Sequence, residues 1–398
     1  MKTKSTAAKV VARKTAAKAA PRKTAVKAVP RNRVVLVLQG GGALGAYQAG
    51  VFQALHENGL APDWVVGTSI GAINAAIIAG NPPEHRVTRL RQFWDRIAQP
   101  DGYDMNKVID AARKFNTWMS TVDAVARGVK GFFAPRVFSP FTSGMAVHPE
   151  EASYYDTAEL AVTLKDLIDF DYLNAPGGTR LTVNAVKVTQ GTLVSFDNRQ
   201  NQLGIEHVMA SGALPPGFPP VRVDGELYWD GGLYSNTPLE TVLDDTPPAD
   251  TLCFMIDLWS ADGPEPTTLD EVQTRQKDVM FASRSTRHIQ SYVRTHNLQR
   301  TVRALYDKLP AKLKSGAGEE VLATLGCDTT MHIVRLEYGG HDWHMAAKDI
   351  NFSKGSIDWR WEQGYQDATR AIREAGWLVA VKDQSAIIVH ELGPRPNQ

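Results

Sequence analysis

The chain has 398 residues, of which 43% are hydrophobic and 22% are charged. This much apolar material can bury a large core, so a chain that is disordered throughout is excluded. Two cysteines, Cys253 and Cys327, cannot build a disulfide framework, and no Cys/His cluster has the spacing of a structural zinc site. The longest apolar run, residues 70–79, is about half as long as a membrane-spanning helix. We therefore expect a soluble or peripheral protein of a reducing compartment.

The formal net charge of +1 hides an asymmetry between a basic N-terminal segment and an acidic body. Residues 1–33 hold eleven of the 44 Lys and Arg residues and none of the 43 acidic ones, which leaves a net charge of −10 for the rest. An Ala/Lys/Pro segment without aromatic residues cannot offset its ordering entropy by burial. We expect residues 1–33 to be a disordered arm that binds polyanions such as DNA, RNA, anionic lipid or the surface of a storage granule.

The basic arm also bears on the location of the protein. It has no apolar stretch of the kind that a secretory signal needs. Its lack of acids also suits a mitochondrial transit peptide, although lysines outnumber arginines and serines are few. The expected location is the cytoplasm, with peripheral contact with a membrane or lipid surface as a further expectation.

Two strand–helix units follow the arm. Residues 34–38 are β-branched and apolar, as in a strand that is buried on both faces, and a glycine turn leads from them into a helix over residues 46–58. Residues 63–66 predict a second strand, and residues 72–79 predict a helix that is apolar all round and therefore buried. Two such units within about fifty residues indicate an α/β sheet with right-handed crossovers.

The rest of the chain continues this alternation without an internal repeat or a long Pro/Gly/Ser linker. Amphipathic helix is expected from residue 84 to about residue 130, and charged helices over residues 268–310. A final amphipathic helix is expected over residues 360–375. Further strands are expected at residues 180–189, 192–196, 227–229, 251–257 and 331–337.

The first glycine turn has two possible meanings. Gly40, Gly42 and Gly45 satisfy the pattern G-x-G-x-x-G between a strand and a helix, which is typical of dinucleotide binding. That fold also needs an acid at the end of the second strand, whereas Asp63 comes at its start. No Gly-Lys-Ser/Thr follows the glycines, so a P-loop is excluded. Backbone N–H groups of such a loop remain suited to bind negative charge.

The second turn supplies a candidate nucleophile. Gly67-Thr68-Ser69-Ile70-Gly71 matches G-x-S-x-G between a β-branched strand and an apolar helix. In this motif the serine occupies a strained strand-to-helix turn that exposes its hydroxyl, and the two glycines leave room for the crossing backbones. The sequence therefore predicts Ser69 as a nucleophile, and the glycines at 40–42 as donors to an oxyanion.

A serine nucleophile needs a base, and no histidine stands in a typical context. His207 lies in an expected helix, and His341 and His344 lie in a glycine-containing segment where surface or packing roles are the ordinary interpretation. Asp230 is the better candidate, because it follows a short strand and precedes Gly231 and Gly232, which let the chain turn sharply. Taken alone, this motif also suits an ordinary Asp-Gly hairpin turn.

Taken together, the motifs resemble those of the patatin-like phospholipases in order and spacing. The resemblance covers residues 34 to about 260, and a segment at residues 349–353 with Gly364 looks like the closing part of bacterial members. No motif is recognised in residues 261–330. The matching segments are residues 39–50 (QGGGALGAYQAG), 67–74 (GTSIGAIN), 210–220 (ASGALPPGFPP), 230–232 (DGG) and 236–238 (NTP).

The resemblance implies a three-layer α/β/α sandwich with a mostly parallel central sheet and a helical C-terminal elaboration. It also implies a Ser-Asp dyad, with Ser69 as nucleophile and Asp230 as base, and a reaction without a metal or an organic cofactor. The oxyanion hole would be the backbone of Gly40, Gly41 and Gly42, and the supporting glycines of the turns would be Gly45, Gly67, Gly71, Gly231 and Gly232.

The expected domains are the arm at 1–33, a catalytic domain at 34–262 and a mainly helical region at 263–398 packed on it. Many patatin-like proteins carry Arg or Lys where this chain has Leu44, so a generic acyl ester is a more secure substrate than a phospholipid. An aromatic cluster is ordinary core or, as a secondary hypothesis, an interfacial lid or acyl pocket. It comprises Phe132, Phe133, Val137, Phe138 and Phe141.

The expected function is hydrolysis of carboxylic esters of phospholipids or related lipids through an acyl-enzyme on Ser69. Two alternatives from other classes stay open. The first is a nucleotide-binding protein that uses the Gly40–Gly45 loop and is indifferent to Ser69. The second is a non-catalytic scaffold that acts through its basic arm.

Overall fold

The computed structural model describes residues 33–101, 120–136, 144, 146–282, 285–310, 314, 325–339, 347–374 and 386–392, except for the side chains of residues 285–288. The arm up to residue 32 therefore lies outside the described residues, and so do Val137, Phe138, Phe141, His341 and His344. In the described part of the chain, no helix combines the length and the hydropathy that crossing a membrane requires.

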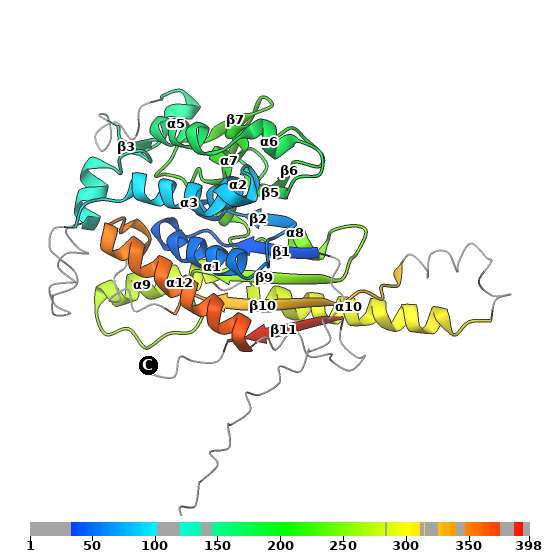
Figure 1. The fold of residues 1–398 in the computed structure, drawn as a ribbon. Coiled ribbons are helices and arrows are strands. Elements are labelled where there is room, and N and C mark those ends of the chain that lie inside the picture. The colour runs from blue at the N-terminus through cyan, green and yellow to red at the C-terminus, as the bar shows by residue number, and fades with distance from the viewer. Residues whose placement is uncertain are drawn as a thin grey trace, which may run out of the picture.

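One twisted sheet organises the fold, and its strands follow one another down Figure 1 from β7 to β11. The order is β11-β10-β9-β1-β2-β5-β8-β7, with β6 paired to β5. The six strands from β11 to β5 are parallel, whereas β6, β8 and β7 are attached antiparallel to their neighbours. The strands are β1 (Arg33–Leu38), β2 (Trp64–Gly67), β5 (Arg180–Lys187), β6 (Thr192–Asp197), β7 (Val221–Val223), β8 (Glu226–Asp230), β9 (Thr251–Asp257), β10 (Met331–Glu337) and β11 (Ile387–Glu391). A separate two-stranded sheet pairs β3 (Ala134–Pro135) with β4 (Tyr155–Asp156).

Helices cover both faces of the sheet. They are α1 (Ala46–Glu57), α2 (Ile70–Ala79), α3 (Pro83–Ile97), α5 (Ala158–Leu167), α6 (Phe170–Asn174), α7 (Ile205–Ser211), α8 (Leu239–Leu243), α9 (Leu269–Ala282), α10 (Ser285–Asp307) and α12 (Lys354–Glu374), and residues 120–127 are also helical. The short 3-10 turns are η1 (Gly42–Gly45), η3 (Pro149–Glu151), η4 (Gly231–Leu233) and η6 (Lys348–Ile350).

Alternate side chains of β1 belong to two separate hydrophobic cores, one on each face of the sheet. Leu36 and Leu38 belong to the large core beneath α1, α2 and α12, whereas Val35 and Val37 belong to a smaller core with residues of α8 and α10. Successive side chains of a strand point to opposite faces, so a strand that is apolar at every position must be covered on both. The predicted three-layer sandwich with a mostly parallel sheet is therefore confirmed.

Most of the expected strands and helices are observed with boundary shifts of up to six residues. The helix expected from residue 84 to about residue 130 is not continuous, because α3 ends at Ile97 and residues 98–101 are not helical, while residues 102–119 lie outside the described part of the chain. Four further strands, β3, β4, β7 and β11, were not predicted. β7 is a three-residue antiparallel strand, and β11 lies at the other edge of the sheet. β10 and β11 come from the C-terminal part of the chain and extend the same sheet, so this part contributes strands as well as helices. Of the aromatic cluster, Phe132 and Phe133 are buried and pack with Phe218 and Phe352.

Helices α1 and α12 pack closely because each presents a glycine to the other's backbone. A Cβ added at Gly50 would lie 1.9 Å from the carbonyl oxygen of Trp361, and one added at Gly364 would lie 2.0 Å from that of Tyr47. Neither position has room for a methyl group, so the two helices would have to separate to accept one.

We predict that Gly50→Ala lowers the free energy of unfolding by about 1–3 kcal/mol, because the added methyl group overpacks the α1–α12 contact. Urea denaturation followed by circular dichroism measures the loss. Gly339→Ala is the matched control, because a Cβ there meets no atom within 4 Å. Equal stability of the two variants would contradict the proposed close contact.

Candidate active site

The turn after β2 holds Ser69 in a conformation that few non-glycine residues adopt. Its φ is 58° and its ψ is −126°, and its side chain is half-buried. The turn is possible because a Cβ at Gly67 would lie 2.4 Å from the carbonyl oxygen of Gly71, and one at Gly71 would lie 2.2 Å from that of Leu38. The structure therefore contains the strained strand-to-helix turn that the motif predicts.

Asp230 reaches this turn because two strands share one edge of β5. The β5 residue Val183 pairs with Gly67 at the end of β2, and two residues further along Ala185 pairs with Asp230 at the end of β8. β6 occupies the opposite edge of β5 over the same residues. Since β8 runs antiparallel to β5 and β2 runs parallel to it, the ends of β2 and β8 meet head-on. This arrangement places Asp230 beside Ser69.

The Asp230 carboxylate is buried and receives two hydrogen bonds. Its side chain is 1% exposed, its Oδ1 accepts from the backbone N–H of Gly232 at 2.7 Å, and the Ser69 side chain is its other partner. Burial raises the pKa of Asp230 to about 7, and the two hydrogen bonds lower it by a smaller amount. A carboxylate with this pKa is half ionised near neutral pH and is a far better proton acceptor than an exposed aspartate.

The turn at Ser69 is also held by residues 211–213, part of a family-like segment to which the sequence analysis assigned no role. The backbone N–H of Ser69 donates to both the Oγ and the carbonyl oxygen of Ser211, each at 3.1 Å. Ser211 Oγ in turn donates to the carbonyl oxygen of Asn184 at 2.7 Å, and the backbone N–H of Asp230 donates to the carbonyl oxygen of Ala213 at 2.9 Å. Residues 211–213 thus fix the backbones of both Ser69 and Asp230.

The glycine loop lies against the serine turn, but its three glycines differ in their hydrogen bonds. The N–H of Gly40 donates to the carbonyl oxygen of Asn236 at 3.1 Å, so it is not directed at a substrate. Among the described residues, no acceptor is paired with the N–H of Gly41 or Gly42, and both glycines are half-buried. A Cβ at Gly40 would lie 3.1 Å from the Cβ of Ser69, which shows how close the loop comes to this serine.

Hydrogen bonds to the carbonyl oxygens of Gly40 and Gly41 orient these two N–H groups. The carbonyl oxygen of Gly40 accepts from Trp259 Nε1 at 2.8 Å and from Asn236 Nδ2 at 3.1 Å. In a trans peptide the C=O and the next N–H point in opposite directions, so the N–H of Gly41 is turned away from Trp259 and Asn236. The carbonyl oxygen of Gly41 accepts from the N–H of Leu44 at 3.1 Å, which fixes the next peptide in the same way.

Gln39, which precedes the glycines, is fully buried and connects the loop to two distant segments. Its Nε2 donates to Thr237 Oγ1 at 2.7 Å, and its Oε1 accepts from the N–H groups of Leu258 and Trp259. Thr237 donates to Asp257, a buried carboxylate that is paired with Arg335. A buried amide with its donor and acceptor both satisfied stabilises one position of the loop.

Residues near the C-terminus complete the surroundings of the loop. A Cβ at Gly42 would lie 2.3 Å from the carbonyl oxygen of Asp349, so only glycine fits there, and the φ of Gly42 is +54°. Asp349 is ion-paired with Lys277 of α9 at 2.8 Å. The C-terminal segment that resembles the closing part of bacterial members therefore packs directly on the expected oxyanion loop.

Other candidates from the sequence lie elsewhere or serve the fold. His207 is buried at the start of α7, where its Nδ1 accepts from the N–H of Gly204 at 2.9 Å. Asp63 is exposed at the N-terminal end of β2, opposite the glycine loop, and accepts from the N–H of Val34. Among the described residues, no group of three or more His, Cys, Asp or Glu side chains is placed to hold a metal ion.

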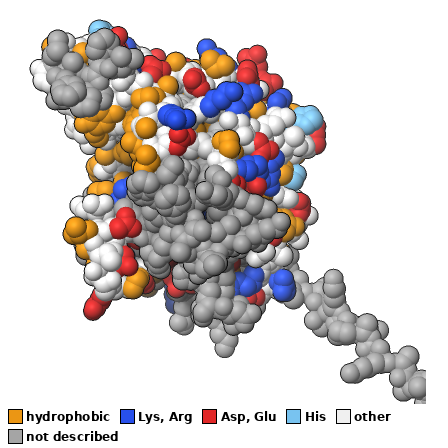
Figure 2. Space-filling view, turned by 90° about the vertical axis from the view of Figure 1, so that its left-hand side faces the viewer, with side chains coloured by type: hydrophobic (Ala, Val, Ile, Leu, Met, Phe, Trp, Pro, Cys, Tyr) orange, Lys and Arg blue, Asp and Glu red, His pale blue; other side chains and the backbone are white. Residues whose placement is uncertain are grey.

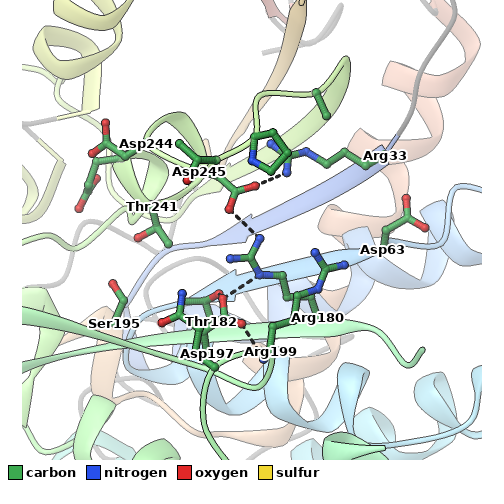
Figure 3. Close-up of a pocket in the computed structure, with 15 residues that line it drawn as sticks. Arg33, Asp63, Arg180, Thr182, Ser195, Asp197, Arg199, Thr241, Asp244 and Asp245 are labelled. Carbon is green, nitrogen blue, oxygen red and sulfur yellow. Dashed lines mark hydrogen bonds and ion pairs between the residues drawn. The ribbon is translucent and has the colours of Figure 1, made fainter. Parts of the chain in front are cut away.

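A cavity of about 850 Å³ lies at the opposite end of the sheet from Ser69 and Asp230. Figure 3 shows Asp245 between Arg33 and Arg180, which are the first residues of β1 and β5. Arg180 also pairs with Asp197 at 2.8 Å and lies 3.9 Å from the ring centre of Trp64. Because these charges satisfy one another, the network ties the amino ends of the strands together.

The proteins that this chain resembles include patatin-like phospholipases and a lipase. Residues 36–243 match the family model described as patatin-like phospholipase, and residues 279–384 match a second model described as patatin phospholipase. Human patatin-like phospholipase domain-containing protein 6 is 29% identical over 208 residues, which are 52% of this chain and 12% of that protein. The triacylglycerol lipase ptl3 of Schizosaccharomyces pombe is 47% identical over 58 residues, 15% of this chain and 12% of that protein.

Among solved structures, VipD from Legionella pneumophila matches with a TM-score of 0.37 and 14% identity over 87% of this chain and 68% of that one. ExoU in its complex with SpcU from Pseudomonas aeruginosa matches with a TM-score of 0.29 and 21% identity over 67% of this chain and 53% of that one. The match to the curated relatives covers only about an eighth of their length. The first family model alone covers more than half of this chain. The chain therefore belongs to the patatin-like phospholipase family.

Proposed function

We propose that the protein hydrolyses carboxylic esters of phospholipids or related lipids, with Ser69 as nucleophile and Asp230 as base. The observation that carries this proposal is a buried carboxylate hydrogen-bonded to a serine in a strained turn. Membership of a family of lipid hydrolases, with relatives named as a phospholipase and a triacylglycerol lipase, supports a lipid ester as substrate. With Leu44 beside the oxyanion loop, the proposal does not require a phosphate on the substrate.

In the acylation step, Ser69 Oγ attacks the ester carbonyl carbon while its proton passes to Asp230. The carbonyl oxygen becomes an oxyanion, which the N–H groups of Gly41 and Gly42 stabilise, each contributing about 3–4 kcal/mol in the transition state. The C–O bond to the alcohol then breaks, Asp230 returns the proton to the departing alkoxide, and the acyl group stays on Ser69. In this scheme Gly40 gives no hydrogen bond to the oxyanion, because its N–H already donates to Asn236. It serves by leaving room for Ser69, since a Cβ at Gly40 would lie 3.1 Å from the Cβ of Ser69.

In the deacylation step, a water molecule gives a proton to Asp230 and attacks the acyl-enzyme. The second oxyanion collapses, the proton returns to Ser69 Oγ, and the fatty acid leaves. A base with a pKa of about 7 suits both steps, because it accepts a proton and releases it again near neutral pH. The proposed steps need only protein groups and water. Transfer of the acyl group to another alcohol would use the same intermediate.

Three further expectations stand beside this reaction as proposals. Contact with a membrane or a lipid granule would bring the enzyme to its substrate. The basic arm would attract polyanions, because residues 1–32 carry ten Lys and Arg residues and no acidic residue. Cytoplasmic location remains a prediction from the sequence.

We predict that a long-chain fluorophosphonate forms one covalent adduct with the protein and none with Ser69→Ala, because the reagent captures an activated serine. Intact-protein mass spectrometry counts the adducts, and fatty-acid release from phospholipid and neutral-ester vesicles ranks the substrates. Ser195→Ala, at an exposed serine of β6, is the matched control and should react as the parent does. An adduct that persists in Ser69→Ala would refute the assignment of the nucleophile.

We predict that hydrolysis of a water-soluble ester rises with pH through about 7 and levels off above about 8, because only the ionised form of Asp230 accepts the proton. The measurement is kcat/KM from pH 5 to pH 9 under constant ionic strength. Asp230→Asn should lose the rise together with most of the activity, by about 10²-fold or more. A profile that is flat from pH 5 to pH 9 in the parent would contradict Asp230 as base.

We predict that Asp230→Asn is more stable than the parent at pH 8. The pKa of Asp230 is about 7 in the folded state and close to 3.8 when unfolded, so the parent loses stability as pH rises between these values. Asn cannot ionise, and its Oδ1 still accepts from the N–H of Gly232. Thermal denaturation should show a gain on the order of a few kcal/mol at pH 8, and little difference at pH 4. A gain that did not depend on pH would refute the titration of Asp230.

A further inference from the structure

Helix α9 (Leu269–Ala282) exposes mainly uncharged side chains to solvent and turns most of its charged side chains toward the protein. Apart from Asp270 in the first turn, every exposed residue of this helix is uncharged, whereas its other charged residues are only partly exposed. A helix on the surface of a water-soluble protein ordinarily shows the opposite pattern. We call the exposed set the α9 stripe; it comprises Leu269, Val272, Gln273, Gln276, Val279 and Met280.

The apolar members of the α9 stripe are strongly exposed. Leu269 is 83% exposed, Met280 57%, Val272 47% and Val279 44%. Their spacing of three, seven and one residues places them on one side of the helix. Solvent exposure of several large apolar side chains on one face marks an interaction surface more often than isolated exposed residues do.

Three charged residues of α9, Arg275, Lys277 and Asp278, bind partners in the body of the protein. Lys277 contacts Asp349 at 2.8 Å, and Asp278 contacts Lys348 at 2.6 Å. Arg275 donates to the carbonyl oxygens of residues 260 and 261. Because these contacts hold the inner face of the helix, the outward direction of the α9 stripe is fixed by the fold.

The C-terminal end of α9 touches the expected oxyanion loop. The carbonyl oxygen of Phe281 accepts from Gln39 Nε2 at 3.3 Å and from Asn236 Nδ2 at 3.4 Å, and the Phe281 and Trp259 rings lie 5.1 Å apart. The same loop that provides Asn236 carries Leu233, which is 45% exposed. α9 lies on the side of the molecule where the parallel strands end (Figure 1), and Figure 2 shows hydrophobic side chains on this side around grey atoms.

We propose that the α9 stripe docks on the surface of one kind of lipid aggregate, the phospholipid bilayer, and so brings the active site to its substrate. This inference rests on the proposed lipid-ester hydrolysis. A long-chain ester resides in such aggregates, so it must pass from the lipid surface to Ser69. The C-terminal end of α9 adjoins the expected oxyanion loop through Phe281. An uncharged, largely apolar helix face at this place enters the interfacial region without burying an unpaired charge, as amphipathic helices do. Continuity with the active site selects lipid over a second protein as the occupant.

The variant that tests this is the triple substitution Val272→Gln, Val279→Gln and Met280→Gln, which replaces the apolar side chains by polar ones that suit a solvent-exposed helix. The control is Leu298→Gln with Leu305→Gln on α10, where both leucines are exposed, 65% and 60%, away from the site. Phosphatidylcholine vesicles in about 0.5 M salt are used, because salt screens any attraction of the basic arm. Flotation measures vesicle binding, and a short-chain soluble ester and a vesicle-embedded ester measure activity.

We expect the α9 variant to lose vesicle binding and vesicle-ester hydrolysis by about tenfold or more, with soluble-ester hydrolysis and the melting temperature unchanged. The α10 control should behave as the parent. Unchanged vesicle binding, or a change of oligomeric state in the α9 variant, would overturn the inference, the latter because the stripe would then join two copies of the chain. Ser69→Ala separates the two proposals, because it should lose hydrolysis and still bind vesicles. If the parent protein binds vesicles but does not hydrolyse esters, the proposed hydrolysis is refuted and the docking surface is not.

Discussion

The site depends on the way in which two strands share one edge of β5. β2 occupies the first part of that edge and stops at Gly67, and β8 enters the same edge from the other direction and stops at Asp230. With β6 on the opposite edge, neither strand can move sideways. A serine turn and a carboxylate that are about 160 residues apart in sequence are thereby brought into hydrogen-bonding contact, and the separation between them is set by backbone pairing.

Building the site costs the protein stability. A carboxylate that is 1% exposed with a raised pKa is a destabilising feature at neutral pH, and the strained φ of Ser69 is another. The surrounding structure compensates for both through hydrogen bonds: Ser211 and Ala213 accept from the backbone N–H groups of Ser69 and Asp230, and the N–H of Gly232 donates to the Asp230 carboxylate. Such local cost is typical of sites whose geometry is determined by function, because a relaxed serine and an exposed aspartate would react poorly.

The geometry of the glycine loop, the proposed oxyanion hole, depends on the groups that lie behind it. The N–H groups of Gly41 and Gly42 are oriented by hydrogen bonds to the carbonyl oxygens of the same peptide units, from Trp259 and Leu44. Asp349 closes the loop from the side and is held by Lys277 of α9. The two matched segments of the chain therefore meet at this loop, and α9 connects it to the outer surface.

The sequence by itself determined the strand–turn–helix units, the position of Ser69 and the candidacy of Asp230, because hydrophobic periodicity and turn glycines are local properties. It also identified the glycine loop. It could not distinguish Gly40 from Gly41 and Gly42, since the acceptor that engages the N–H of Gly40 belongs to Asn236, 196 residues away.

Only the tertiary structure decided which groups support the site and which face of α9 meets water. Ser211 was visible only as part of a family-like segment, and its contact with Ser69 exists because α7 ends beside the turn. β11 was missed because a short edge strand carries little periodic signal. The sequence could not show which side of α9 faces the protein. A charged side chain such as Lys277 points inward only because a distant partner, Asp349, is there to pair with it.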